Sequence, residues 1–285
     1  MTDLKKYKVC VTPTSYGKSD TRLLSDLESQ VGEVVYNKIG RPLTSDEVRK
    51  MVSNCDAYIA GLDTIDRFAL ETATKLKVIA RYGVGVDNVD LAAASEKGII
   101  VTNTPGANSV SVAELTIALI LSLVRNIPEA AFATRKGEWP RQNGITLEGK
   151  CVGLIGFGAI GKAVGRRLKA FDMRVIAYDL FPDKDFASKY DIEIASLDQT
   201  LKDSDFISLH LPLLPETREF VNASFFGKMK KDSYLINTSR GELINESDLN
   251  TAMEQGHLNG AALDVFSKEP PGVDNPLLQQ QNVIV

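Results

Sequence analysis

The chain has 285 residues, of which 44% are hydrophobic and 25% charged, as in ordinary globular proteins of about two domains. Its 33 basic and 37 acidic residues give a net charge of −4 with no basic block, which excludes nucleic acid and anionic membranes as expected partners. The longest apolar stretch, 115–124, is interrupted by Thr116 and Ser122 and is too short to span a bilayer.

The first residues lead straight into a strand-like run and contain no signal-peptide core, which predicts a cytoplasmic protein. Cys10, Cys55 and Cys151 are odd in number and far apart in the sequence, and each lies in or beside an apolar run. This arrangement predicts buried free thiols in a reducing cytosol.

Residues 1 to about 103 alternate short apolar runs with stretches of helical periodicity. One helix is expected to begin at Thr44, because Glu47, three residues later, completes a capping box. Alternation of this kind predicts a parallel sheet with helices on both faces. The expected strands are 9–12, 33–36, 57–60, 78–82 and 99–103.

Two glycines, Gly83 and Gly85, follow the strand expected at 78–82. Ligands of parallel sheets bind at the carboxyl ends of the strands, where glycines let backbone N–H groups face a ligand. An ordinary strand-to-helix turn explains the same residues equally well, and the segment 81–90 alone does not decide between the two.

A hinge is predicted at 103–106, where proline and glycine follow each other. We expect a long helix after it, capped by Ser109 or Ser111, reaching Asn126, and kinked or restarted by Pro128. Because this helix is apolar almost all round, it is expected to be buried, either in its own subunit or against a second copy of the chain.

The segment 151–161 has the pattern of a strand, a glycine turn and the start of a helix. Gly156, Gly158 and Gly161 match G-x-G-x-x-G: the first permits a tight turn, the second lets backbone approach a pyrophosphate, and the third lets the helix pack closely on the strand. Asp179 ends a second apolar run about 18 residues further on, where a carboxylate accepts the ribose hydroxyls of adenosine. No Arg directly follows that acid, so NAD is favoured over NADP.

From residue 151 onward the alternation repeats, with strands expected at 151–155, 174–179, 205–209, 233–238, 260–265 and 282–285. The fold class predicted for the whole chain is α/β, with two doubly wound parallel-sheet domains. We place the boundary at the hinge, which gives domains 1–103 and 104–285.

Several motifs in a fixed order carry a resemblance to a known family. They are the segment 81–90, Asn-Thr-Pro-Gly at 103–106, Val-Ala-Glu-Leu at 112–115, the glycine motif, His-Leu-Pro at 210–212 with Thr217, Asn-Thr-Ser-Arg-Gly at 237–241, and Ala-Leu-Asp-Val-Phe at 262–266 with Glu269-Pro270. From about residue 52 to residue 285 the chain resembles the NAD-dependent D-2-hydroxyacid dehydrogenases, and most of all their D-3-phosphoglycerate dehydrogenase branch.

The resemblance implies a flavodoxin-like substrate domain at 1–103 and a Rossmann NAD-binding domain at 104–285. It implies hydride transfer between nicotinamide and C2 of a D-2-hydroxy acid or 2-keto acid, with 3-phosphoglycerate among the candidates. It also implies a homodimer that pairs through the long helix after Ser109.

Roles of single residues follow from the same resemblance. Arg240 is expected to be catalytic, because a planar guanidinium can grip a carboxylate and a C2 oxygen together, and Glu269 is expected to orient a catalytic His. Val84, Gly85 and Arg240 are expected to bind the substrate, and no metal site is expected. The cofactor is expected to contact Gly156, Gly158, Ala159, Ile160, Gly161, Asp179, His210, Leu211, Pro212, Thr217, Thr238, Ser239, Arg240 and Asp264.

One departure from the family concerns the acid/base. In the family a His follows the strand expected here at 282–285, and neither His210 nor His257 lies at the matching position; a His at a strand end is usually structural. We therefore expect residues 1–285 to be a fragment that lacks this His and the segment that completes the substrate domain, and to be inactive by themselves.

The sequence does not decide between a phosphorylated and an unphosphorylated substrate. Arg81 and Arg141 are candidates for contacting a phosphate, whereas Asp63, just after the third strand, would repel one, so an unphosphorylated acid is nearly as well supported. A non-catalytic NAD-sensing binding protein and an NAD-dependent formate dehydrogenase are the alternative functions for this fold. The presence of Arg240 and Glu269 favours the enzyme over the sensor.

Overall fold

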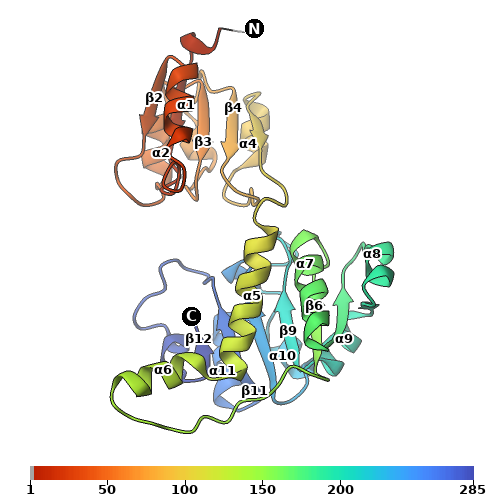
Figure 1. The fold of residues 1–285 in the computed structure, drawn as a ribbon. Coiled ribbons are helices and arrows are strands. Elements are labelled where there is room, and N and C mark those ends of the chain that lie inside the picture. The colour runs from red at the N-terminus through yellow and green to blue at the C-terminus, as the bar shows by residue number, and fades with distance from the viewer. Residues whose placement is uncertain (1–2) are drawn as a thin grey trace. The chain divides into compact units, whose positions relative to one another are not determined.

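In the computed structural model, which describes residues 3–285, the chain divides into two compact units, one ending at Asn108 and the other running from Ser109 to Val285 (Figure 1). Each unit has its own sheet, and every strand pairing in both sheets is parallel. The predicted fold class, α/β with two parallel-sheet units, is confirmed.

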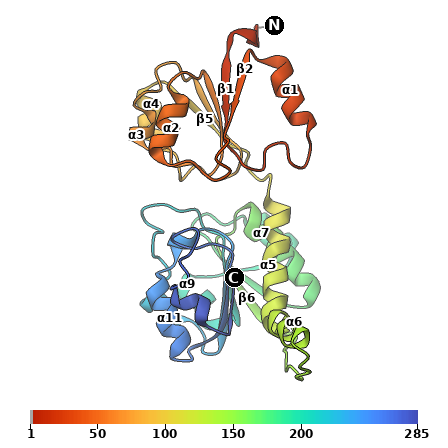
Figure 2. The same cartoon turned by 90° about the vertical axis from the view of Figure 1, so that its left-hand side faces the viewer.

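Unit 1 contains a five-stranded sheet in the order β2-β1-β3-β4-β5. Helix α1 covers one face, and α2, α3 and α4 cover the other (Figure 2). Alternate residues of β1 serve the two faces: Val9 and Val11 pack on the α1 side and Cys10 on the α2 side. The elements are η1 Leu4–Lys6, β1 Lys8–Val11, α1 Arg22–Gln30, β2 Glu33–Tyr36, α2 Ser45–Val52, β3 Ala57–Ala60, α3 Arg67–Leu70, β4 Val78–Arg81, α4 Leu91–Glu96 and β5 Ile100–Thr102.

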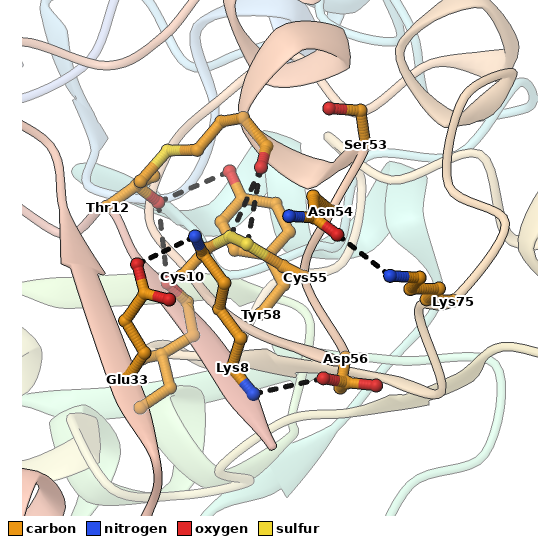
Figure 3. The surroundings of a disulfide bond; sticks show 12 residues. Lys8, Cys10, Thr12, Glu33, Ser53, Asn54, Cys55, Asp56, Tyr58 and Lys75 are labelled. Carbon is orange, nitrogen blue, oxygen red and sulfur yellow. Dashed lines mark hydrogen bonds and ion pairs between the residues drawn. A yellow bond between two sulfur atoms is a disulfide. The ribbon is translucent and has the colours of Figure 1, made fainter. Parts of the chain in front are cut away.

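Cys10 of β1 and Cys55, in the loop between α2 and β3, form a disulfide (Figure 3). The prediction of free thiols is therefore wrong for these two residues, and the reducing compartment inferred from it loses its support. The cysteines are 45 residues apart in sequence, and they meet because β1 pairs directly with β3, which begins two residues after Cys55. Cys151 is free and buried, as predicted, and burial raises the pKa of its thiol.

Unit 2 contains a seven-stranded sheet in the order β12-β11-β10-β9-β6-β7-β8. Helices α5, α7 and α8 pack on one face, and α9, α10 and α11 on the other. The elements are α5 Ser109–Val124, α6 Ile127–Arg135, β6 Cys151–Ile155, α7 Ala159–Leu168, η2 Lys169–Phe171, β7 Arg174–Tyr178, α8 Lys184–Lys189, β8 Glu193–Ile194, α9 Leu197–Asp203, β9 Phe206–Leu209, α10 Ala223–Lys228, β10 Ser233–Asn237, η3 Gly241–Leu243, α11 Glu246–Glu254, β11 Leu258–Leu263, η4 Pro276–Gln279 and β12 Val283–Ile284.

The long helix predicted to reach Asn126 ends at Val124, and a second helix starts at Ile127, which confirms the predicted restart at Pro128. Asn126 adopts a left-handed conformation between α5 and α6, and Pro128 lies in the first turn of α6, where its missing N–H is harmless. Helix α5 buries Ile117, Ile120 and Leu123 against the sheet. Over residues 3–285, no single helix is both long and apolar enough to cross a membrane; α5 and α6 meet that length and composition only as a pair bent by 63°.

Candidate dinucleotide and substrate sites

The predicted cofactor residues of unit 2 gather at one edge of its sheet. Because all strands run parallel, the residues that follow β6, β7, β9, β10 and β11 meet at the same edge. They are Gly156, Asp179, His210, Thr238 and Asp264. The strand order reverses between β6 and β9, and open α/β sheets bind their ligands at such a reversal.

The three glycines of the motif occupy three different environments, each suited to its predicted role. Gly156 has φ +101°, which only glycine adopts readily, and its N–H donates to the Tyr178 carbonyl at 2.8 Å. A Cβ on Gly161 would lie 2.2 Å from the Gly156 carbonyl oxygen, so a side chain there would separate α7 from the turn. A Cβ on Gly158 would meet no atom within 4 Å. The second glycine thus leaves open space in front of the turn.

That space lies at the N-terminus of α7, because Gly158 is the N-cap residue of this helix. The first N–H groups of a helix have no intrahelical acceptor, and the helix dipole adds partial positive charge there. Ala159 and Ile160 form the first turn and supply these donors through their backbone. The arrangement fits the pyrophosphate of a dinucleotide.

Asp179 is fixed by two backbone donors. Its Oδ2 accepts from the N–H of Phe157, inside the glycine turn, at 2.6 Å, and its Oδ1 accepts from the N–H of Phe181 at 2.8 Å. Each carboxylate oxygen can accept a further hydrogen bond, as binding of two ribose hydroxyls requires. The carboxylate therefore links the turn after β6 to the loop after β7.

His210 lies beneath the glycine turn. Its Nε2 is 3.0 Å from the Ser208 hydroxyl, and its carbonyl is the group that a Cβ on Gly156 would strike at 2.5 Å. Burial lowers the pKa of His210 to about 4, and Nδ1 is buried without a hydrogen-bond partner among the described residues 3–285. The ring is therefore neutral near pH 7, and the role of His210 toward a cofactor stays a prediction.

The loop that follows His210 is closed by Thr217. Its hydroxyl donates to the Pro212 carbonyl at 2.7 Å and accepts from the Leu214 N–H at 2.8 Å. Leu211 is half-buried and packs against the core beneath the sheet. The Thr217 hydroxyl thus stabilises the loop 212–217 through its own backbone. These two hydrogen bonds explain the threonine without a direct contact to a cofactor.

Arg240 follows a turn that other side chains hold. Asn237 Nδ2 donates to the Arg240 carbonyl at 2.8 Å, and the Ser239 hydroxyl donates to the Leu209 carbonyl at 2.6 Å. The Thr238 hydroxyl is 2.9 Å from that of Thr116 in α5. The guanidinium of Arg240 donates to the Ser239 carbonyl at 2.7 Å.

The loop after β11 packs directly against this turn. A Cβ on Gly241 would lie 1.9 Å from the backbone of Phe266, so glycine is required beside Arg240. Asp264 and Glu269 are exposed on this loop, and Glu269 Oε1 accepts from the Phe266 N–H at 3.2 Å. The packing brings together the two segments that carry the predicted catalytic residues.

In unit 1, the Gly83-Val84-Gly85 segment has its carbonyls occupied and its donors unoccupied. Gly83 O accepts from the Thr104 hydroxyl at 3.0 Å, Val84 O from Asn103 Nδ2 at 2.7 Å, and Gly85 O from Arg81 Nε at 3.2 Å. Within the described part of the chain, the three N–H groups have no hydrogen-bond acceptor. Consecutive free N–H groups of this kind suit an anion such as a carboxylate.

Asp63 does not face a ligand, contrary to the prediction that it would repel a phosphate. Its side chain is fully buried and accepts from the Tyr58 hydroxyl at 2.9 Å, the Gly61 N–H at 3.0 Å, the Leu43 N–H at 2.7 Å and the Thr12 hydroxyl. The carboxylate points into unit 1 and holds its loops.

Arg141 and the charged residues around a cavity of unit 2 are two further candidate places for ligand binding. Arg141 is exposed in the segment between α6 and β6 of unit 2, and its contact with a phosphate stays a prediction. A cavity of about 750 Å³ lies at the opposite edge of the unit 2 sheet, and its charges compensate one another, since Lys169 pairs with Asp191 and Arg174 with Glu193, each at 2.7 Å. Over residues 3–285 no group of His, Cys, Asp and Glu side chains is arranged to hold a metal ion.

A doubly wound sheet with this glycine turn and an acid after its second strand defines unit 2 as a dinucleotide-binding domain. Residues 117–285 match the family model described as D-isomer specific 2-hydroxyacid dehydrogenase, NAD binding domain. The chain belongs to the D-isomer specific 2-hydroxyacid dehydrogenases, and unit 2 contains their NAD-binding domain.

Individual relatives agree with this assignment. The chain is 45% identical over 259 residues to a D-3-phosphoglycerate dehydrogenase of Methanocaldococcus jannaschii, covering 90% of this chain and 49% of that protein. It is 38% identical to a glyoxylate reductase of Korarchaeum cryptofilum, covering 86% and 76%. A D-lactate dehydrogenase from Aquifex aeolicus, solved with NAD and lactic acid, is 29% identical with a TM-score of 0.85, covering 97% and 86%. The chain spans about half the length of the D-3-phosphoglycerate dehydrogenases it matches.

Proposed function

We propose that the protein is an NAD-dependent oxidoreductase that transfers a hydride between nicotinamide and C2 of a D-2-hydroxy acid or 2-keto acid, with unit 1 as the substrate domain. The observation that carries this proposal is the position of Arg240, at the carboxyl end of β10 and on the same sheet edge as the glycine turn. A guanidinium there can bind a substrate carboxylate and polarise the C2 oxygen.

The reaction balances as follows in the direction of oxidation. The C2–H bond of the hydroxy acid breaks, its electron pair leaves as hydride, and the hydroxyl proton goes to a base. A bound NAD would supply the hydride acceptor, its nicotinamide ring. In unit 2, Arg240 is proposed to bind the substrate, and Asp264 and Glu269 are proposed to position the nicotinamide amide and an acid/base. In unit 1, the Gly83–Gly85 N–H groups are proposed to bind a carboxylate.

A second candidate function is an NAD-sensing binding protein. The enzyme needs an acid/base for the hydroxyl proton, whereas the sensor does not. His210 is half-buried and neutral, with its Nε2 3.0 Å from the Ser208 hydroxyl, and His257 Nε2 donates to the Met229 carbonyl at 3.2 Å, so both histidines of residues 1–285 contact the protein itself. This observation favours a sensor, or slow turnover, for residues 1–285 by themselves.

The test uses NADH deuterated at C4 and the full gene product, with pyruvate, hydroxypyruvate, 2-oxoglutarate and phosphohydroxypyruvate as acceptors. Deuterium at C2 of the product, found by mass spectrometry, supports the enzyme even when turnover is slow. Tight NADH binding without deuterium in any product would establish the sensor instead.

We also propose a homodimer formed through α5, α6 and the segment that follows them. Val110, Ile127, Phe132 and Trp139 are 56%, 50%, 61% and 85% exposed, a set of large apolar side chains that one subunit leaves in water. Phe132→Glu should convert the dimer to a monomer in light scattering, whereas Phe181→Glu, at a residue 91% exposed elsewhere in unit 2, should not. A cytoplasmic location remains a prediction.

A further inference from the structure

Three loops converge at the carboxyl ends of β1, β3 and β4 in unit 1. Ala60 and Arg81 are register partners, and the Tyr82 N–H donates to the Ala60 carbonyl at 3.0 Å, so the residues just beyond them lie side by side. The loop after β1 covers the same place, since a Cβ on Gly61 would lie 3.0 Å from Pro13 Cα. The rings of Tyr16 and Tyr82 meet edge to face with centroids 5.7 Å apart.

The charged side chains at this edge are committed to the protein. Asp63 is enclosed by the donors described above. Arg81 is 4% exposed, and its guanidinium donates to the Ala60 carbonyl at 2.7 Å, to the Gly61 carbonyl and, through Nε, to the Gly85 carbonyl. Moving this guanidinium toward a substrate phosphate would break bonds that hold the loops after β3 and β4, and the freed carbonyls would then be unsatisfied.

The exposed side chains of the β3 and β4 loops include one leucine and one tyrosine beside Thr64, Asp66 and Asp87, and none of them is a cation. Leu62 is 70% exposed and Tyr82 is 46% exposed. The loops 61–66 and 82–90 contain no Lys or Arg. Tyr82 is followed directly by the Gly83–Gly85 segment with its free N–H groups, so an apolar surface adjoins a carboxylate-binding surface.

We propose that the substrate is a 2-keto or 2-hydroxy acid whose chain beyond C2 is uncharged and apolar or aromatic, with its carboxylate on the Gly83–Gly85 N–H groups and its chain against Leu62 and Tyr82. This inference rests on the proposed hydride transfer and narrows its substrate class. Contact of an apolar chain with Leu62 and Tyr82 favours larger acids, because each added methylene buried in such a surface changes specificity by about 10-fold or more. A second anionic group would meet these side chains without a counter-ion.

The test compares kcat/KM of the full gene product for reduction of 4-methyl-2-oxopentanoate and phenylpyruvate with that for phosphohydroxypyruvate and 2-oxoglutarate. The apolar acids should exceed the doubly charged acids by at least about tenfold. In Leu62→Arg this ratio should fall by about tenfold or more, because a guanidinium would then face the end of the substrate. Leu4→Arg is the matched control, an exposed leucine that precedes β1 at the other edge of the sheet, and it should leave the ratio unchanged.

The possible results distinguish failure of the proposed substrate class from failure of the proposed hydride transfer. A preference for phosphohydroxypyruvate or 2-oxoglutarate would overturn the apolar assignment and leave hydride transfer standing. An equal effect of Leu62→Arg and Leu4→Arg on the ratio would overturn the placement of the substrate chain against Leu62. Reduction of none of the four acids would overturn both proposals.

Discussion

Replacing Gly158 by Ala should weaken NADH binding without weakening the fold. The residue has φ −73°, which any amino acid adopts, and its new Cβ would meet no protein atom within 4 Å. Alanine is a poorer N-cap than glycine, but it also lowers the entropy of the unfolded chain by an amount equivalent to about 0.4–1 kcal/mol. We therefore expect the free energy of unfolding to stay within about 1 kcal/mol of the parent.

The cofactor should respond differently, because the added methyl group would occupy the space assigned to the pyrophosphate. Displacing a phosphate from one backbone N–H at the start of α7 removes a hydrogen bond to a charged group, which contributes about 1.5–3 kcal/mol. The dissociation constant of NADH should then rise by about 10- to 150-fold. Isothermal titration calorimetry measures this constant, and thermal unfolding of the free protein measures the stability.

Gly161→Ala is the matched control, since its Cβ would lie 2.2 Å from the Gly156 carbonyl oxygen. Relief of that contact must move α7 or the turn, so we expect a loss of stability of about 1–3 kcal/mol together with weaker binding. Parent-like NADH affinity in Gly158→Ala would refute the placement of the pyrophosphate. A large loss of stability in that variant would show that the space in front of Gly158 is not open.

Four further outcomes are expected. Asp179→Ser should reduce the preference for NADH over NADPH, because the carboxylate that faces the 2′-phosphate is removed; equal affinity for both cofactors in the parent chain would contradict this. The pKa of His210 is lowered to about 4, whereas its unfolded value is 6.5, so between these pH values the unfolded chain binds the extra proton. The free energy of unfolding should therefore fall by up to about 3 kcal/mol as the pH decreases through that window. In urea titrations, His210→Gln should flatten this pH dependence. Cys55→Ser should destabilise unit 1 by about 4 kcal/mol in the loop-entropy model for cysteines 45 residues apart, and reductant should lower the stability of the parent and of Cys151→Ser but not that of Cys55→Ser; alkylation of three thiols in the denatured, unreduced chain would rule the disulfide out. Arg240→Lys should lower turnover of the full gene product steeply with little change in NADH affinity, and a parallel loss of both would point to a structural role.

The strands and the glycine turn could be predicted because their signals are local. An apolar run of strand length followed by Gly156 and Gly158 encodes a strand, a turn and a helix within about ten residues. Strand β8 was missed, since Glu193–Ile194 is too short to form an apolar run. Strand β11 was predicted two residues late, because its first residues, Leu258-Asn259-Gly260, resemble a turn.

Pairings between distant residues were the part that sequence reasoning could not reach. Cys10 and Cys55 are joined by strand order, and nothing in the neighbourhood of either cysteine indicates the other. Asp63 was misread for the same reason: an acid after a strand looks available to a ligand, and only the fold brings the Tyr58 hydroxyl and the Leu43 N–H to it. The motif residues Asn103 and Thr104 were noticed, but their bonds to Val84 and Gly83 were not.

Asn103, Thr104, Arg81 and Asn237 share one task, which explains how the candidate sites are built. Asn103, Thr104 and Arg81 bind the carbonyls of the Gly83–Gly85 segment, and Asn237 binds the carbonyl of Arg240. A carbonyl that already accepts a hydrogen bond fixes the peptide plane, and the N–H groups of the same segment are then held outward. In unit 2 the start of α7 presents its donors without such help, because a helix N-terminus has them free by construction. Polar side chains near both sites therefore act mainly on the backbone, and the backbone presents the donors that an anionic carboxylate or pyrophosphate needs.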